Sequence, residues 1–106
     1  MLTAREAREL MERGEVEVVD VREPVEWSGG HIEGSRLVPL DRLRASPSAS
    51  LPRDGVIFVC AAGVRSQTAA RIAEATGLSQ VYNLVGGTRA WAKAGYPLVR
   101  ELAAAV

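Results

Sequence analysis

Several features that would narrow the function are scarce in this sequence. Its 106 residues include a single cysteine and a single histidine, and aromatic residues make up only 5%. A lone cysteine cannot form an internal disulfide, so nothing in the chain demands an oxidising compartment. The 13 basic residues balance the 13 acidic ones, so the formal net charge is zero. This balance offers no electrostatic reason to expect nucleic acid or an anionic membrane as a partner.

Long hydrophobic runs are also missing. No segment approaches the roughly 20 consecutive apolar residues that a membrane-spanning helix needs. Residues 1–15 alternate charged with short apolar side chains, which is unlike a secretion signal. We therefore expect a cytoplasmic protein that makes no contact with a membrane. The length and the 47% hydrophobic content are typical of one globular domain, expected over residues 1–106 with its core at about 3–101.

Short apolar segments alternate along the chain with segments of helical character. A capping box of Thr3 and Glu6 predicts a helix that ends near Gly14. The alternation predicts an α/β domain, in which a mainly parallel sheet is covered by helices on both faces. Residues 46–55, rich in serine and proline, are expected to form a polar loop. The expected strands lie at residues 16–22, 35–40, 56–60 and 80–85, and the further helices at residues 24–29, 40–45, 66–77 and 88–95.

Cys60 stands where an apolar strand gives way to a turn of small residues. In open parallel sheets, ligands bind beyond the carboxyl ends of the strands, where each connection leads into a helix. The helix expected from Ser66 would direct its unpaired N–H groups and its positive dipole end toward this turn. Ala61 and Ala62 are small and Gly63 tolerates unusual backbone angles, so the loop can curl tightly and cradle an anion.

The same surroundings bear on the reactivity of the thiol. A free cysteine titrates near about 8.5, and a helix N-terminus or a neighbouring cation such as Arg65 lowers that pKa. The thiolate is the nucleophilic form, so Cys60 is expected to be ready for covalent chemistry at neutral pH. His31 lies far upstream, so activation is expected to be electrostatic rather than by a cysteine–histidine pair. A lone cysteine that ends an apolar strand is more often a small packed residue, but the glycine, arginine and helix start that follow favour the nucleophile.

Three separated motifs resemble the rhodanese-like sulfurtransferase family, and together they extend over nearly the whole chain. The stretch "VVDVREPVEWSGGHIEGS" resembles the first signature of the family, "VCAAGVRS" resembles its active-site loop and "LVGGTRAWAKAGYPL" resembles its closing segment. All three occur in the order that the family has. The resemblance implies the single-domain form of the rhodanese-like fold, with a mainly parallel five-stranded sheet.

The resemblance also implies a reaction. Cys60 would take the outer sulfur of a small anionic donor such as thiosulfate or a polysulfide, or of a protein persulfide, and become a persulfide. A thiol or cyanide acceptor would then remove that sulfur, with no cofactor and no metal. Arg65 would either bind the donor or stabilise the loop by bonding its carbonyls. The loop residues implied in binding the persulfide and its donor are Ala61, Ala62, Gly63, Val64, Arg65 and Ser66.

Two alternative functions remain open at this point. One is a persulfide carrier or regulatory module with little turnover on small donors. The other is a cysteine phosphatase or arsenate reductase that uses the same thiolate. Cysteine phosphatases that share this fold use the pattern Cys-x-x-x-x-x-Arg, whereas Cys60 and Arg65 give a pattern one residue shorter. The shorter loop favours a sulfane sulfur over a tetrahedral phosphate.

A few polar and aromatic residues outside the loop are candidates for supporting roles. Asp20 and Arg22 end a strand at the edge where the loop begins, and we expect them to bond each other and nearby backbone. The alternative is that they orient the loop without touching the substrate themselves. His31 is expected to be a hydrogen-bonded turn residue, because it lacks the accompanying histidine, cysteine and carboxylate ligands that a metal site needs. Trp27 and Trp91 are expected to pack at the edge of the core, although either position would also suit the mouth of a site.

Overall fold

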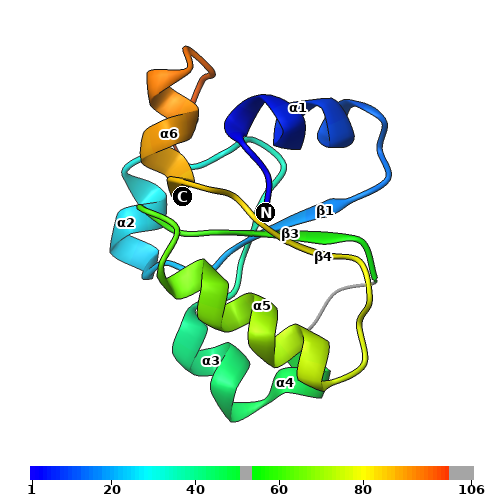
Figure 1. The fold of residues 1–106 in the computed structure, drawn as a ribbon. Coiled ribbons are helices and arrows are strands. Elements are labelled where there is room, and N and C mark those ends of the chain that lie inside the picture. Colours follow the sequence, from blue (N-terminus) through cyan, green and yellow to red (C-terminus); the bar gives the residue numbers. More distant parts are fainter. Residues whose placement is uncertain (51–53, 101–106) are drawn as a thin grey trace.

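A parallel sheet forms the centre of the molecule. The computed structural model describes residues 1–50 and 54–100 of the chain. Four strands pair in the order β2-β1-β3-β4, and all three pairings are parallel (Figure 1). Asp20 lies opposite Val59, so the carboxyl ends of the two central strands meet at one edge of the sheet. The strands are β1 (Glu17–Asp20), β2 (Arg36–Leu37), β3 (Val56–Val59) and β4 (Val81–Asn83).

The expected fifth strand is not formed within the described residues, so that part of the prediction is wrong. Beside β4, Leu2 makes only an isolated parallel bridge with Leu84. The Leu2 amide donates to the Asn83 carbonyl at 2.9 Å, and the Val85 amide donates to the Leu2 carbonyl at 2.8 Å. Pairing cannot extend further toward the carboxyl end, because Thr3 already caps the first helix.

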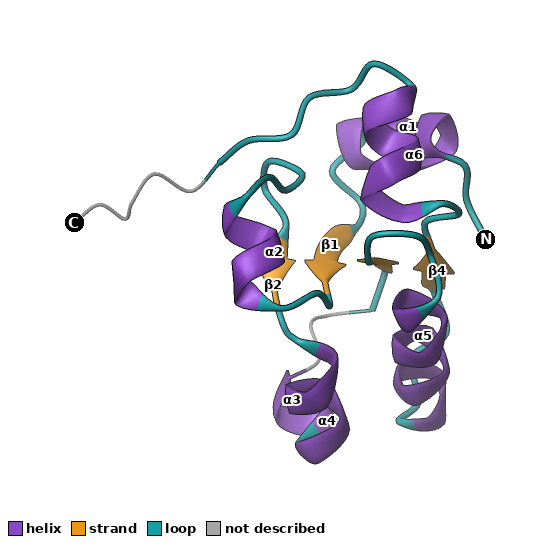
Figure 2. Cartoon of the chain, turned by 90° about the vertical axis from the view of Figure 1, so that its left-hand side faces the viewer, coloured by secondary structure: helices purple, strands orange, loops and turns teal. Residues whose placement is uncertain are grey.

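Helices cover both faces of this sheet (Figure 2). Because side chains alternate along β3, Ile57 and Val59 pack with Trp91 on one face, while Phe58 and Cys60 pack with Ala69 on the other. No helix in the described part of the chain is both long and apolar enough to cross a membrane. The helices are α1 (Ala4–Glu12) and α6 (Gly87–Lys93) on the first face, α3 (Leu40–Ala45), α4 (Pro47–Ser50) and α5 (Arg65–Ala75) on the second, and α2 (Pro24–Ser28) directly after β1.

Local sequence signals account for where several of these helices begin and end. The Thr3 and Glu6 capping box forms as expected, and each side chain accepts from the backbone amide of the other. The expected loop at residues 46–55 instead contains α4, so that prediction is wrong at its first half. Pro47 stands at the first helical position, where its fixed φ suits a helix, and the Ser50 amide donates to the Ser46 carbonyl. Residues 51–53 lie outside the described part of the chain.

Candidate active site

Cys60 follows β3 directly, and its sulfur is surrounded by hydrogen-bond donors. The Gly63 amide donates to Sγ at 3.1 Å, and the Ser66 amide lies 3.4 Å from it. The Ser66 hydroxyl oxygen is also 3.4 Å from Sγ. The residue is only 1% exposed and belongs to the core cluster beneath α5. Cys60 is therefore a packed residue whose sulfur nevertheless faces donors from the following turn and helix.

Two carbonyls of the same loop, at Cys60 and Ala61, point the other way, toward the start of α6. The Thr88 amide donates to the Cys60 carbonyl at 2.8 Å, and the Arg89 amide donates to the Ala61 carbonyl at 3.2 Å. With its carbonyls bonded there, the loop turns amides toward the sulfur. Gly63 has φ +94°, and a Cβ atom at this position would lie 3.1 Å from the Gly86 amide nitrogen. The contribution of α6 to the loop was not inferred from the sequence.

These contacts act on the acidity of the thiol in opposite directions. Burial raises the pKa of Cys60, because it penalises the charged form. Hydrogen bonds from the Ser66 hydroxyl and from the amides of Ser66, Ala62 and Gly63 lower it, and together they outweigh burial. The pKa of Cys60 therefore lies below that of an ordinary thiol, which favours the nucleophilic thiolate.

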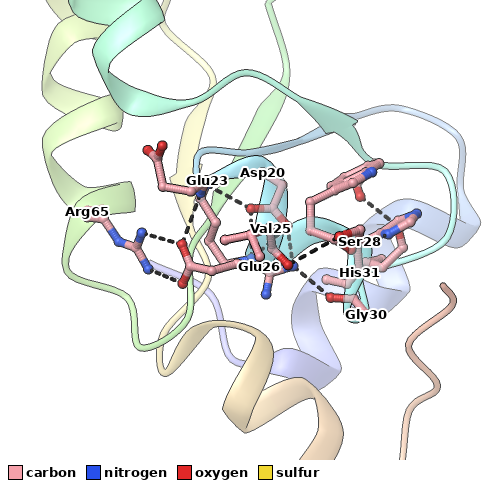
Figure 3. Close-up of polar contacts among 12 residues, drawn as sticks. Asp20, Glu23, Val25, Glu26, Ser28, Gly30, His31 and Arg65 are labelled. Atoms are coloured by element: carbon pink, nitrogen blue, oxygen red, sulfur yellow. Dashed lines mark hydrogen bonds and ion pairs between the residues drawn. The ribbon is translucent and has the colours of Figure 1, made fainter. Parts of the chain in front are cut away.

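Arg65, the first residue of α5, reaches across to α2 rather than to the loop carbonyls. Its two terminal nitrogens donate to the two carboxylate oxygens of Glu26 at 2.8 and 2.9 Å (Figure 3). The bonds from Arg65 lower the pKa of Glu26 to about 2. Of the two roles expected for Arg65, bonding loop carbonyls is carried out by α6 at Cys60 and Ala61 and by Asn83 at Gly63, and binding a donor stays a prediction. Glu26 was not singled out from the sequence, since 39 positions separate the pair.

Replacing Glu26 with glutamine is expected to lower the thermal stability at neutral pH and to matter less in acid. The pKa of Glu26 lies at about 2 in the folded protein, against an ordinary value of 4.5. A carboxyl group with a depressed folded pKa stabilises the fold above its unfolded pKa, and this contribution disappears as the pH falls through the folded value. The melting temperatures of wild type and Glu26→Gln should therefore converge between pH 4.5 and about 2.

At neutral pH, Glu26→Gln is expected to lower the melting temperature by about 5 °C or less, since solvent screens the partly exposed pair of Glu26 and Arg65. Exposed Glu33 provides the control, and Glu33→Gln should show no such convergence in thermal melts at the same pH values. A Glu26→Gln difference that stays constant from neutral pH to pH 2 would mean that the carboxylate of Glu26 does not stabilise the fold.

Asp20 and Arg22 bond each other at the end of β1. The closest contact joins Arg22 Nη2 to Asp20 Oδ2 at 2.8 Å, and both side chains are almost fully buried. The same nitrogen donates to the Gly30 carbonyl at 2.8 Å (Figure 3). These contacts are the mutual bonding expected for the pair. Its alternative role, in which it orients the cysteine loop, stays a prediction.

The aromatic residues and the histidine lie in packed positions. His31 stacks on Trp27 with ring centroids 3.6 Å apart, and its Nδ1 is 2.9 Å from the Trp27 carbonyl oxygen. Trp91 is 4% exposed and donates from its indole to the Pro97 carbonyl at 2.9 Å. Within residues 1–50 and 54–100, no group of three or more histidine, cysteine, aspartate or glutamate side chains is placed to hold a metal ion.

Asn83 is a further residue of the site that sequence reasoning missed. It ends β4, is 5% exposed, and lies on the Cys60 side of the sheet. Its side chain bonds both the Ser66 hydroxyl and the Gly63 carbonyl. The only signal in the sequence was a polar amide in an otherwise apolar strand, because such a residue, when buried, needs partners.

Comparison with known proteins identifies a family and several relatives of this chain. The family model described as "Rhodanese-like domain" matches residues 3–94. The probable adenylyltransferase/sulfurtransferase MoeZ of Mycobacterium tuberculosis is 37% identical over 99 residues, which cover 91% of this chain and 25% of that protein. The thiosulfate sulfurtransferase GlpE of Pseudomonas aeruginosa is 35% identical over 96 residues, which cover 91% of this chain and 86% of that protein. The chain thus spans only a quarter of the length of MoeZ.

Solved structures show the same similarity. The crystal structure of a rhodanese-related protein from Thermoplasma volcanium matches with a TM-score of 0.84 and 34% sequence identity. The match covers 94% of this chain and 97% of that one. The similarity therefore covers nearly the whole length of both chains.

Proposed function

The chain belongs to the rhodanese-like domain family, and we propose that it is a sulfurtransferase that carries a sulfane sulfur as a persulfide on Cys60. The observation that carries this proposal is the arrangement of donors on Sγ, where the amides of Gly63 and Ser66 converge on one atom. Such donors stabilise the Cys60 thiolate, which is the form that attacks the outer sulfur of a donor.

The proposed reaction has two displacement steps at sulfur. The Cys60 thiolate attacks the outer sulfur of thiosulfate, the sulfur–sulfur bond of the donor breaks, and sulfite leaves with the electron pair. A cyanide ion or an acceptor thiolate then attacks the terminal sulfur of the Cys60 persulfide. That attack yields thiocyanate or an acceptor persulfide and returns the Cys60 thiolate. The donor supplies the sulfur at its own oxidation level, so no external oxidant or reductant is needed.

The confined surroundings of Cys60 support sulfur as the transferred group. The residue is 1% exposed, and a terminal sulfur is a single atom that needs little room. A phosphoryl group brings three additional oxygens, and its loop would need correspondingly more inward amides. The Arg65 guanidinium is partly neutralised by Glu26. Its proposed role is to attract an anionic donor with the N–H groups that Glu26 does not occupy.

Intact-mass spectrometry after treatment with thiosulfate tests the proposal. A gain of about 32 Da, reversed by cyanide with release of thiocyanate, is the expected result. Because Cys60 is the one cysteine of the chain, a single sulfur adduct can be assigned to it. The absence of any adduct with thiosulfate, a polysulfide and a low-molecular-weight persulfide would overturn the proposal. Hydrolysis of an aryl phosphate by the same preparation would favour the phosphatase alternative.

A protein donor or acceptor is the second candidate, and the relationship to MoeZ favours it. In that protein the related segment is a quarter of a longer chain described as an adenylyltransferase and a sulfurtransferase. If this chain passes sulfur to or from another protein, turnover on thiosulfate and cyanide should be slow even though the mass adduct forms. Sulfur transfer of either kind needs a free thiol, so we place it in a reducing compartment such as the cytoplasm.

A further inference from the structure

The Asn83 side chain has a fixed orientation between two partners. Its Nδ2 donates to the Gly63 carbonyl at 3.2 Å, and its Oδ1 accepts from the Ser66 hydroxyl. A carbonyl can only accept, so rotating the amide by half a turn would place two oxygens against each other. Oδ1 must therefore face Ser66, and it can only accept there.

This orientation commits the single hydroxyl proton of Ser66. A serine hydroxyl has one proton to donate and lone pairs with which to accept. While that proton is donated to Asn83, the Ser66 oxygen presents a lone pair to Sγ, 3.4 Å away. The arrangement suits a protonated Cys60, whose S–H donates to Ser66, and forms a chain from thiol to hydroxyl to amide.

A thiolate at Cys60 requires the opposite arrangement. It can only accept, so Ser66 must rotate its O–H toward Sγ and give up its bond to Asn83. We propose that Asn83 is a positioning residue that competes with the Cys60 thiolate for the hydroxyl proton of Ser66. The competition favours the protonated thiol, against the amides of Gly63 and Ser66, which favour the thiolate. It rests on the proposed function, because it assumes that Cys60 is the nucleophile.

Charged groups from several neighbouring elements lie around the sulfur. Arg65 on α5 interacts electrostatically with Cys60, and its pKa is raised by Glu26 of α2. The pKa of Glu26 is about 2, so it stays ionised at any pH used to titrate a thiol. Asp20, which ends β1, is paired with Arg22. On α6, Arg89 lies beside the loop, because its backbone amide donates a hydrogen bond to the Ala61 carbonyl.

The test is a double-mutant cycle on the acidity of Cys60. The rate of alkylation by iodoacetamide, measured between about pH 5 and 10, gives the thiol pKa, and thiolate absorbance in the ultraviolet checks it. In the wild type, Cys60 should have a pKa below that of an ordinary thiol. Asn83→Leu should lower the pKa further, by about one unit, the size expected when a hydrogen bond to a charged group is no longer contested. Ser66→Ala should raise it.

The double variant decides whether Asn83 acts through Ser66. In the Ser66→Ala background, Asn83→Leu should leave the alkylation pKa unchanged, because no shared proton remains. A shift of the same size in both backgrounds would mean that Asn83 acts through the Gly63 carbonyl and would overturn the proposal, as would a raised pKa in Asn83→Leu. Asn83→Ala serves if the leucine variant does not fold. Alkylation reports thiol acidity whether or not sulfur is transferred, so failure here is distinct from failure of the proposed function.

Discussion

Replacing Cys60 with serine is expected to lower kcat/KM for sulfur transfer from thiosulfate to cyanide by at least about a thousandfold. The hydroxyl has the shape of the thiol and lies among the same donors. It differs in acidity, since an alcohol remains protonated where these donors ionise a thiol. Without the thiolate there is no attack on the donor sulfur. Because the chain has no second cysteine, no other thiol can take over.

The same substitution should leave the fold nearly unchanged, which separates chemistry from structure. The serine oxygen can accept from the amides of Gly63 and Ser66, so no buried N–H loses its partner. Cys60→Ala removes the sulfur acceptor and leaves the amides of Gly63 and Ser66 without that hydrogen-bond partner. Thermal melts should therefore rank wild type and Cys60→Ser close together and Cys60→Ala lower, by about 5 °C or more. Residual turnover in Cys60→Ser above a tenth of wild type would exclude Cys60 as the nucleophile.

The features that local sequence determines were predicted well. The capping box of Thr3 and Glu6 fixes the start of α1, since its hydrogen bonds join residues only three positions apart. The apolar run of β3 and the glycine-containing turn after it place Cys60 at the carboxyl edge of the sheet. Residue types within a short window were enough for these predictions, because the interactions that decide them lie within that window.

The features that depend on distant contacts were not predicted. Glu26 pairs with Arg65 across 39 positions, and Asn83 reaches Ser66 across 17. Each contact depends on how α2 and β4 pack around the loop, which no local pattern records. The fifth strand was expected from the family resemblance and not from a local pattern. Within the described residues only Leu2 bridges to Leu84 beside β4, and the cap of α1 begins directly after it.

The loop around Cys60 is held at both faces of its backbone. Its amides face the sulfur, and its carbonyls at Cys60 and Ala61 accept from the first amides of α6. The site therefore depends on how closely α6 approaches β3. Two glycines, Gly86 and Gly87, allow that approach, and Gly87 lies directly against the backbone of the loop.

Gly87→Ala is accordingly expected to be the most destabilising single-methyl change at the site. A Cβ atom at Gly87 would lie 2.1 Å from the Cys60 carbonyl oxygen and 2.6 Å from the Ala61 carbonyl carbon and oxygen. All three atoms are backbone, so relief requires α6 or the loop to move. The free energy of unfolding should fall by about 3 kcal/mol or more, which lowers the melting temperature by about 12 °C or more. Any folded fraction should lose thiosulfate turnover, because the loop amides would be displaced.

Gly14→Ala separates the clash from the backbone strain. Gly14 has φ +71°, close to the +62° of Gly87, but a Cβ atom there meets nothing within 4 Å. Both variants therefore carry the cost of a left-handed alanine, about 1–2 kcal/mol, and only Gly87→Ala adds the collision. Thermal melts of the two variants measure the difference directly. If they melt together, and both keep full turnover, then α6 can withdraw from the loop without consequence, and the contact between α6 and the loop does not hold the amides on Cys60.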